Sequence, residues 1–476
     1  MDSLRKYRTP TLAPVFDPGP FPECSGKKRS TCPPLFVDRS RVITRARTGV
    51  ADNIVNATVR SVSKWEPRLL QPSAYPSAFR RLAWSSLAAQ SAEQIALSAA
   101  SLVAVLAFGA GTGGTGLLQA AQTLPFLLLS IPAGLLADRT ASRPRLLAAA
   151  EALRVASLVV ILVLAGLGLL SLPLLALLGF IGAVGTVSYS VTTPALVPSL
   201  VLREALPSAN GRIELARTTA FAAGPALGGA LVGWVGSGPA FGAAAGLSIL
   251  AVVLLSGVRE PARSKVPRRH PLTEVREGAA FVFRHPLLGP VFATQVAFNL
   301  AFFVLQAAYV PYAVHHLGLG AFGVGLTLAA YGIGLVVGAL SAARIVSALP
   351  FGVVVGIGPL SGLASSLMMA LTILLPWPPL AGLAFFVMGA GPVVWVVSTT
   401  TLRQTVTPAR LLGRVSALNI LTYGARPVGA ALAALVGESY GSEACLLLAV
   451  LGFLIQALVI FGSPVPRLAH LPEVPA

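Results

Sequence analysis

The chain has 476 residues, of which 55% are hydrophobic and only 11% are charged. A soluble domain carries about 25% charged residues, so most of this chain must face lipid. The formal net charge of +18 could point to nucleic acid or to a membrane. Residues 1–81 hold fifteen Lys and Arg against six Asp and Glu, and the other basic residues lie mostly in loops between apolar runs. This distribution indicates membrane topology, and we expect no nucleic-acid partner.

Residues 1–80 are rich in Pro, Arg and Ser and contain no apolar run long enough to span a membrane. We predict a disordered basic arm on the cytoplasmic side, because a secretory signal would place an apolar core directly after a short basic start. A start codon assigned too far upstream would give the same kind of sequence, and that alternative stays open. The three cysteines, Cys24, Cys32 and Cys445, indicate no disulfide framework.

From Arg81 onward, apolar runs of about 20 residues follow one another, which is the length that crosses a bilayer as a helix. Six runs precede a polar segment and six follow it. The expected spans are 82–107, 113–137, 146–168, 172–199, 213–235, 239–257, 287–313, 320–343, 349–375, 377–402, 414–436 and 442–463. We predict an all-α membrane protein with four parts after the arm. These are a six-helix bundle at 81–257, a linker at 258–285, a second bundle at 286–463 and a tail at 464–476.

Lys and Arg occur in the loops on one side of these spans, and the loops on the other side carry none. By the positive-inside rule, the basic loops and both termini are cytoplasmic, so we expect a multi-pass protein of the plasma membrane. The sequence of the two halves also repeats. Gly211 and Gly413 are separated by the same number of residues as Pro225 and Pro427, so both residues occupy equivalent positions in the two halves. We therefore predict two pseudo-symmetric bundles.

A charged stretch, Gly134-Leu-Leu-Ala-Asp138-Arg139-Thr-Ala-Ser-Arg143-Pro-Arg145, separates the second and third spans. Its charges cannot lie in hydrocarbon, so we predict a short loop at the membrane face. The spacing resembles the loop between helices 2 and 3 of the major facilitator superfamily. In that family the Asp and Arg pin neighbouring helices and separate when the transporter rocks, and the resemblance gives Gly134, Asp138, Arg139 and Arg143 this role.

A second motif, Gly224-Pro225-Ala-Leu-Gly228-Gly229, lies in the fifth span. Small residues let helix backbones approach closely, so a plain packing face is one interpretation. The motif also resembles one in drug:proton antiporters of the superfamily, where it closes a gate. Stretches around 194–210 and 402–415 resemble the subgroup with the enterobactin exporter and macrolide-efflux-like proteins. The resemblance covers about 82–463 and implies two parallel six-helix halves.

An ionisable residue in the middle of a membrane is costly and usually functional. Glu93 lies eleven residues into the first expected span, about 17 Å deep. Because desolvation favours the neutral form of a carboxyl group, we predict that Glu93 couples transport to protons. The alternative is a carboxyl held by Ser91, Gln94 or an arginine without titrating. Arg426 is similarly deep and could pair with a carboxylate, bind an anionic substrate or hydrogen-bond backbone carbonyls.

Two acid–base pairs, Glu151 with Arg154 and Glu214 with Arg217, are each spaced so that both members share a helix face. We predict that both pairs lie near the cytoplasmic helix ends and act as structural latches. The candidate cavity residues are polar and aromatic residues on the helices that usually line the cavity in the superfamily. They are Gln90, Tyr189, Thr192, Gln295, Asn299, Gln306, Tyr309, Trp395, Ser398 and Thr399. A mostly apolar cavity with scattered hydrogen-bond donors suits a lipophilic solute.

The sequence contains no phosphate-binding loop for ATP and no zinc-protease motif, so we expect neither an enzyme nor a cofactor or metal. The expected function is proton-coupled efflux of a small lipophilic compound by a secondary transporter, with the monomer as the superfamily's default. An importing symporter or uniporter is the alternative within transport. A membrane-embedded enzyme or a non-transporting sensor is the alternative from another class.

Overall fold

A computed structural model describes most of the chain from Tyr75 onward. The described residues are 75–140, 142–202, 205–260, 271–408, 411, 414–415, 418–419, 421–470 and 472, without the side chains of Asp138, Pro207 and 271–275. The predicted arm at 1–80 therefore lies outside the described residues, except for its last six.

Six helices are described in the first half of the chain. They are α2 (Ser77–Leu106), α3 (Thr112–Arg139), α4 (Arg143–Gly166), α5 (Leu172–Leu200), α6 (Leu206–Trp234) and α7 (Ser237–Ser256). The second half begins with α8 and continues through five longer helices and two short 3-10 turns. These elements are α8 (Pro271–Arg284), α9 (Leu288–His315), α10 (Ala321–Ala348), α11 (Phe351–Leu371), α12 (Pro378–Val406), η4 (Thr422–Gly424), α14 (Ala425–Phe461) and η5 (Val465–Arg467).

Ten helices in the described residues are long and apolar enough to cross a membrane. Helix α6 is not among the ten, because its first half carries Arg212, Glu214 and Arg217. Helix α14 has 37 residues and reverses at Gly441, whose φ of 82° is outside helical geometry. A continuous helix of that length would measure about 55 Å, far more than a bilayer core. With α6 counted and α14 divided at Gly441, the twelve predicted crossings are confirmed.

The helix ends differ from the prediction on the polar side of the membrane. Helix α3 continues through Arg139 and α4 begins at Arg143, so Gly134 and Arg139 lie in a helix and the predicted loop shrinks to 140–142. Helix α6 begins seven residues before the predicted span. Polar residues are stable in a terminal helical turn where water reaches them, and Arg139 also complements the negative helix C-terminus. The predicted linker holds the amphipathic helix α8.

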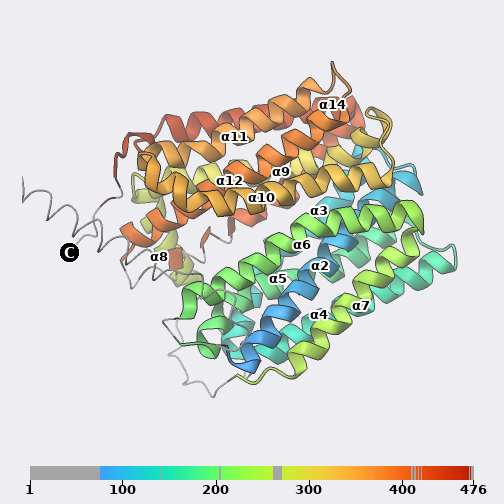
Figure 1. Cartoon of the computed structure of the whole chain (residues 1–476), viewed down its shortest axis with the longest axis horizontal. Helices are drawn as coiled ribbons and strands as arrows, with labels where there is room; N and C mark the ends of the chain where they lie inside the picture. Colours follow the sequence, from blue (N-terminus) through green and yellow to red (C-terminus); the bar gives the residue numbers. More distant parts are fainter. Residues whose placement is uncertain are drawn as a thin grey trace, which may run out of the picture. The chain divides into compact units, whose positions relative to one another are not determined.

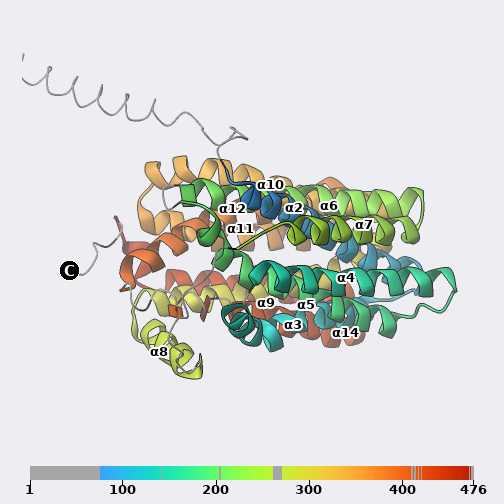
Figure 2. The ribbon, with the colours of Figure 1, turned by 90° about the horizontal axis from the view of Figure 1, so that it is seen from below.

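The helices form two groups, α2–α7 and α9–α14, which lie side by side in Figure 1 and overlap in the view from below in Figure 2. Helix α6 packs on α2 of its own bundle and on α10 of the other. The first part of α14 repeats this arrangement, because α14 packs on α9 and on α3. This matched pairing is the structural form of the repeat seen in the sequence.

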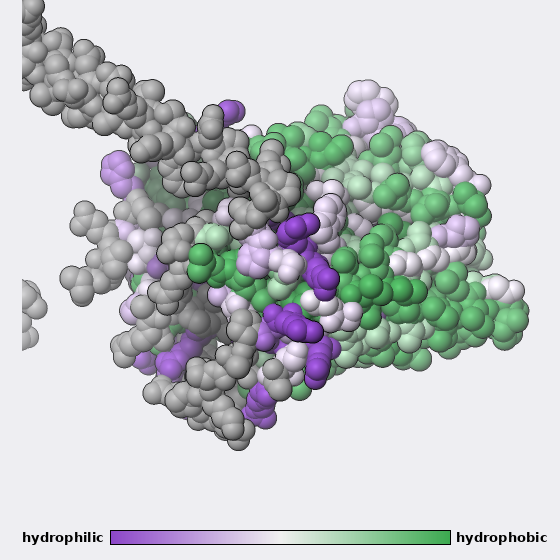
Figure 3. Space-filling model, turned by 60° about the horizontal axis from the view of Figure 1, so that its bottom comes forward, coloured by the Kyte–Doolittle hydropathy of each residue, from purple (hydrophilic) through white to green (hydrophobic). Residues whose placement is uncertain are grey.

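The two ends of the bundles differ in charge. We call the end with Arg139, Arg143 and Arg344 the basic end, and the end with Gly111, Gly236 and Gly441 the opposite end. Each bundle has its own apolar core, one around Ile95 and Phe241 and the other around Tyr309 and Phe385. Large apolar side chains also cover the outside, with Leu340 and Leu435 exposed by 75% and 70%. On the face drawn in Figure 3, strongly hydrophilic residues gather towards one end and the rest is mainly apolar, as a lipid-facing surface requires.

Candidate functional site

A cavity of about 190 Å³ lies near the middle of the helices and is lined by both bundles. Helices α2 to α5 supply most of its wall, α6 and α7 add a few residues, and α9, α10, α12 and α14 contribute the other side. Leucine and phenylalanine are the commonest side chains of the apolar part of the wall, which also contains alanines, Ile161, Val310 and Pro225. The polar part consists of Glu93, Arg154, Arg426, Gln94, Ser98, Ser101, Gln119, Gln122, Thr123, Ser157, Thr186, Gln306 and Tyr331.

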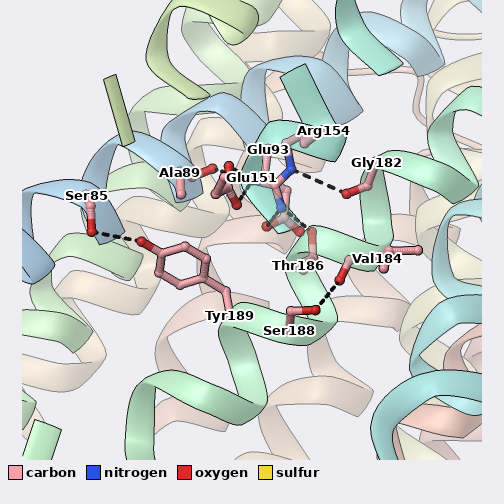
Figure 4. Close-up of polar contacts among 10 residues, drawn as sticks. All are labelled: Ser85, Ala89, Glu93, Glu151, Arg154, Gly182, Val184, Thr186, Ser188 and Tyr189. Carbon is pink, nitrogen blue, oxygen red and sulfur yellow. Dashed lines mark hydrogen bonds and ion pairs between the residues drawn. The ribbon is translucent and has the colours of Figure 1, made fainter. Parts of the chain in front are cut away.

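Arg154 holds together the charged part of the first bundle, as Figure 4 shows. Its Nη1 lies 2.9 Å from a carboxylate oxygen of Glu151 and donates to the carbonyl oxygen of Ala89 at 3.0 Å. Its Nη2 donates to the hydroxyl of Thr186 at 2.6 Å and lies 3.8 Å from Oε2 of Glu93. The side chain of Glu151 is fully buried, whereas that of Glu93 is 17% exposed. Glu151 is therefore the tight partner of Arg154, and Glu93 is the looser partner on the cavity side.

This arrangement corrects the prediction that Glu151 and Arg154 lie near a helix end. Arg154 is eleven residues into the 24-residue helix α4, about 17 Å from its start. The predicted i, i+3 pairing is present, but the pair is buried at mid-helix beside the cavity. The expected span begins at 146 and so places the pair within about two helical turns of its end. The sequence could not show that carbonyls and Thr186 of neighbouring helices would satisfy the guanidinium there.

Arg426 lies on the cavity wall in the second bundle, inside a group of aromatic rings. Its guanidinium carbon lies 3.9 Å from the centre of the Tyr423 ring, 4.9 Å from that of Phe126 and 5.4 Å from that of Phe303. Its Nε donates to Oδ1 of Asn299 at 3.0 Å. Within the described part of the chain, no carboxylate oxygen lies within 4.0 Å of its nitrogens. Because Phe126 belongs to α3, the cation–π contact joins the two bundles.

The Gly224–Gly229 motif has two packing faces. Gly224 and Gly228 face α2, where an added Cβ would meet the side chains of Gln94 and Ser98. Gly229 faces α10 of the other bundle, where a Cβ would lie 2.5 Å from the carbonyl oxygen of Ala321. Only glycine permits this approach of α6 to α10. Ser98 also donates to the carbonyl oxygen of Pro225 at 3.3 Å.

The pseudo-symmetric contact on the other side of the cavity joins α3 to α14. A Cβ on Gly116 would lie 2.6 Å from the backbone nitrogen of Ala434. Next to it, the hydroxyl of Thr115 donates to the carbonyl oxygen of Ala307 on α9 at 2.8 Å, and Gln119 donates to that of Gln306 at 3.2 Å. These backbone contacts close the bundles against each other towards the opposite end.

At the basic end, Arg143 joins several segments of the first bundle. Its Nη1 donates to the carbonyl oxygen of Ala195 at 2.6 Å and to Glu260 at 3.3 Å, and its backbone N–H also donates to Glu260. Of the neighbouring motif residues, Arg139 is exposed, Gly134 approaches Val191, and the side chain of Asp138 lies outside the described part.

The second predicted pair, Glu214 with Arg217, lies in the first half of α6 and is present. Nε of Arg217 donates to both carboxylate oxygens of Glu214, at 3.1 and 3.0 Å. The two side chains are 54% and 39% exposed. The Arg217 guanidinium also lies over the ring of Phe221, a residue of the cavity wall.

Of the ten predicted cavity residues, only Gln306 belongs to the wall of this cavity. Several others form local contacts, such as Tyr189 with Ser85 at 2.8 Å and Tyr309 with Thr327. Asn299 contributes indirectly through Arg426. The nine outside the wall are Gln90, Tyr189, Thr192, Gln295, Asn299, Tyr309, Trp395, Ser398 and Thr399.

Most of these nine differ from the wall residues in depth along the helix. On α5 the wall ends at Thr186, and Tyr189 and Thr192 follow about one and two turns nearer the basic end. Gln90, Gln295, Asn299 and the α12 residues are displaced in the same direction. The wall residues that the prediction missed include polar groups of α2 and α3, namely Gln94, Gln119, Gln122 and Thr123. The i, i+3, i+4 spacing of the three α3 residues marks one polar helix face and could have revealed them.

The sequence of residues 73–475 matches the family described as transmembrane secretion effector. A search of curated proteins found no matching sequence. Among solved structures, the chain is similar to a POT family transporter in complex with 5-aminolevulinic acid, with a TM-score of 0.66, 13% identity, and coverage of 83% of this chain and 97% of that one.

The nucleoside transporter NupG is similar with a TM-score of 0.60 and 14% identity over 80% of this chain and 98% of that one. A bacterial homologue of the iron transporter ferroportin, in an inward-facing state, gives a TM-score of 0.58 and 18% identity over 80% and 98%. Identities this low bear on the fold alone, and they agree with two six-helix bundles. The chain thus belongs to the transmembrane secretion effector family and is a membrane transporter of the major facilitator superfamily.

Proposed function

We propose that this transporter exports a small lipophilic compound in exchange for protons, by alternating access of the cavity between the two bundles. Glu93 carries the proton. The basic end faces the cytoplasm of a plasma-membrane protein, in keeping with the positive-inside rule. The glycine contacts of α6 with α10 and of α3 with α14 form the gate towards the outside.

The observation that carries this proposal is the sharing of Arg154 between two carboxylates. Glu151 is the closer partner, at 2.9 Å, and it is fully buried. Glu93 lies 3.8 Å away and is partly exposed to the cavity. With both carboxylates ionised, these three residues carry one net negative charge, which Arg426 balances only from the opposite wall of the cavity. A proton on Glu93 removes that charge. A proton can reach Glu93 through the cavity, whereas Glu151 is buried outside the cavity wall.

Exchange of substrate for protons requires that the substrate and the proton do not bind to the transporter at the same time. An ionised carboxylate accepts several hydrogen bonds, whereas a protonated one keeps a weaker acceptor set and adds a donor. A substrate whose hydroxyl or amide group donates to Glu93 therefore competes with the proton. Antiport results if the transporter changes from the inward-open to the outward-open state with substrate bound and changes back with the proton bound. This requires that each ligand stabilises the conformation that it must occupy.

The composition of the wall supports a lipophilic solute of limited size. Apolar atoms form most of the surface, with phenylalanine and leucine as the commonest apolar side chains and separate polar groups between them. This is the usual composition of small-molecule sites. A volume of about 190 Å³ is below the range of about 300–1,000 Å³ for drug-sized ligands, so the cavity suits a small compound or one end of a longer one.

The test uses inverted membrane vesicles that contain the full chain and an uncharged naphthylamine fluorophore as solute. Respiration acidifies the vesicle interior, so an exporter accumulates the fluorophore inside and an uncoupler releases it. We expect uptake by wild type and by the surface variant Glu438→Gln, and loss of gradient-driven uptake in Glu93→Gln. Equal gradient-driven uptake by Glu93→Gln and wild type would contradict the role of Glu93. A downhill import of the fluorophore together with protons would contradict antiport.

A further inference from the structure

The charged residues at the cavity are balanced before any substrate binds. Glu93 and Glu151 contribute two negative charges, and Arg154 and Arg426 contribute two positive charges. The tight pair of Glu151 with Arg154, at 2.9 Å, is internally neutral. Glu93 then keeps only its looser contact with Arg154, at 3.8 Å, and Arg426 has no carboxylate oxygen within 4.0 Å among the described residues; the two lie on the walls of opposite bundles. The ionised site has no net charge for a substrate to neutralise.

A charged substrate would upset this balance in a poorly solvated region. Transferring an uncompensated charge into such a region is unfavourable. A cation meets a further obstacle, since two guanidinium groups but only one carboxylate belong to the described wall. Three of the aromatic rings in this region, Phe126, Phe303 and Tyr423, already surround Arg426 and are therefore occupied by a cation.

The other polar groups of the wall suit an uncharged, oxygen-bearing compound. Gln94, Gln119 and Gln122 carry amides, each of which has donors and an acceptor, and Thr123 adds a hydroxyl. Arg426 uses its Nε on Asn299, and no residue in the described part of the chain accepts a hydrogen bond from its two Nη atoms. These Nη groups can donate to a carbonyl, while Glu93 can accept from a hydroxyl.

We propose that the cavity binds an uncharged amphiphile with hydroxyl and carbonyl groups, and that Arg426 is the specificity residue that excludes organic cations. The inference rests on the proposed function in placing the substrate in this cavity. Glu93 accepts from the substrate hydroxyl and Arg426 donates to the substrate carbonyl, on opposite walls. The Phe126, Phe303 and Tyr423 rings and the bond from Nε to Asn299 hold the guanidinium in place, which leaves its two Nη groups for the ligand.

The test measures binding of three fluorescent probes to the full chain in nanodiscs. The probes share one naphthalene body and differ only in the head group, which is a hydroxyethyl amide, a trimethylammonium or a carboxylate. Titrations at about pH 8, where an ordinary carboxyl group is ionised, compare wild type with Arg426→Gln and Arg426→Lys. Arg344→Gln is the matched control, because it removes an exposed positive charge of α10 outside the cavity.

We expect wild type and Arg344→Gln to bind the amide probe at least about tenfold more tightly than the ammonium probe. Arg426→Gln should lose this preference by gaining affinity for the ammonium probe, a change that misfolding does not produce. Arg426→Lys retains the positive charge and should still exclude the cation. The proposal is overturned if the ammonium or the carboxylate probe binds wild type most tightly, if the amide probe does not bind, or if Arg426→Gln keeps the wild-type preference. Because no proton gradient is present, failure of proton coupling leaves these affinities unchanged, and the two proposals fail separately.

Discussion

Replacing Gly229 with alanine tests whether the backbone contact between α6 and α10 holds the opposite end closed. The new Cβ would lie 2.5 Å from the carbonyl oxygen of Ala321 and 2.9 Å from Cα of Gly325. Both atoms belong to the backbone of α10, so no rotation of a side chain relieves the overlap. Ordinary contact distances begin at 3.4 Å, and α6 and α10 must therefore separate by up to about 1 Å.

The cost of this separation falls on the closed state alone. Overpacking a close contact costs about 1–3 kcal/mol. A change of that size shifts a two-state equilibrium about 5- to 150-fold. We therefore expect Gly229→Ala to move a large fraction of molecules to a state that is open at the opposite end, while the helices within each bundle stay folded.

Spin labels report this change when placed at Gly111 and Ser439, exposed positions of different bundles at the opposite end. The background replaces the three cysteines, and pulsed electron–electron double resonance gives the distance distribution between the labels. Gly242→Ala is the control, because a Cβ on that α7 glycine meets no atom within 4 Å. Gly229→Ala should add a longer distance that the control lacks. Identical distributions for the two variants would refute the assigned gate.

Three further predictions concern stability. Glu151→Gln removes the close partner of the buried Arg154 guanidinium and should cost about 3 kcal/mol, seen as a lower melting temperature; an unchanged value would mean that Glu93 replaces it fully. Gly441→Ala places a side chain at φ 82° and should cost about 1–2 kcal/mol in thermal unfolding, whereas Gly242→Ala should not destabilise. Partial burial lowers the pKa of His285 from its ordinary value of 6.5, so its stabilising contribution is present above that pH and is lost as pH falls. The melting temperature of wild type should therefore drop more than that of His285→Gln between about pH 7 and pH 5; equal slopes would contradict this.

The sequence predicts the number and type of helices well because a bilayer imposes one length and one secondary structure on every crossing. The twelve apolar runs correspond to twelve crossings, including α6, whose charges lower its hydropathy. The ends of the helices are harder to predict, since polar residues such as Arg139 are stable both in a loop and in a terminal helical turn. The amphipathic helix α8 lies in the segment predicted as a linker, because its sequence contains no apolar run long enough to indicate a membrane span.

The cavity was predicted less well because the depth of a cavity depends on how bundles meet, which no single helix encodes. Glu93 and Arg426 were found because ionisable residues are rare in membrane spans. Thr192 and Trp395 are on expected helices but lie outside the cavity wall, nearer the basic end. The position of Arg154 depends on the carbonyl of Ala89 and the hydroxyl of Thr186, contacts between helices that are distant in sequence.

The central claim is that substrate and proton compete for Glu93, and proton release on binding tests it most directly. Purified protein in a weakly buffered detergent solution receives the uncharged naphthylamine fluorophore, and an indicator dye records the protons released at several pH values from about 5 to 9. We predict that wild type releases up to about one proton per bound fluorophore over part of this range. Glu93→Gln should bind the fluorophore and release none, while Glu438→Gln should behave as wild type. Equal release by Glu93→Gln and wild type would contradict the account.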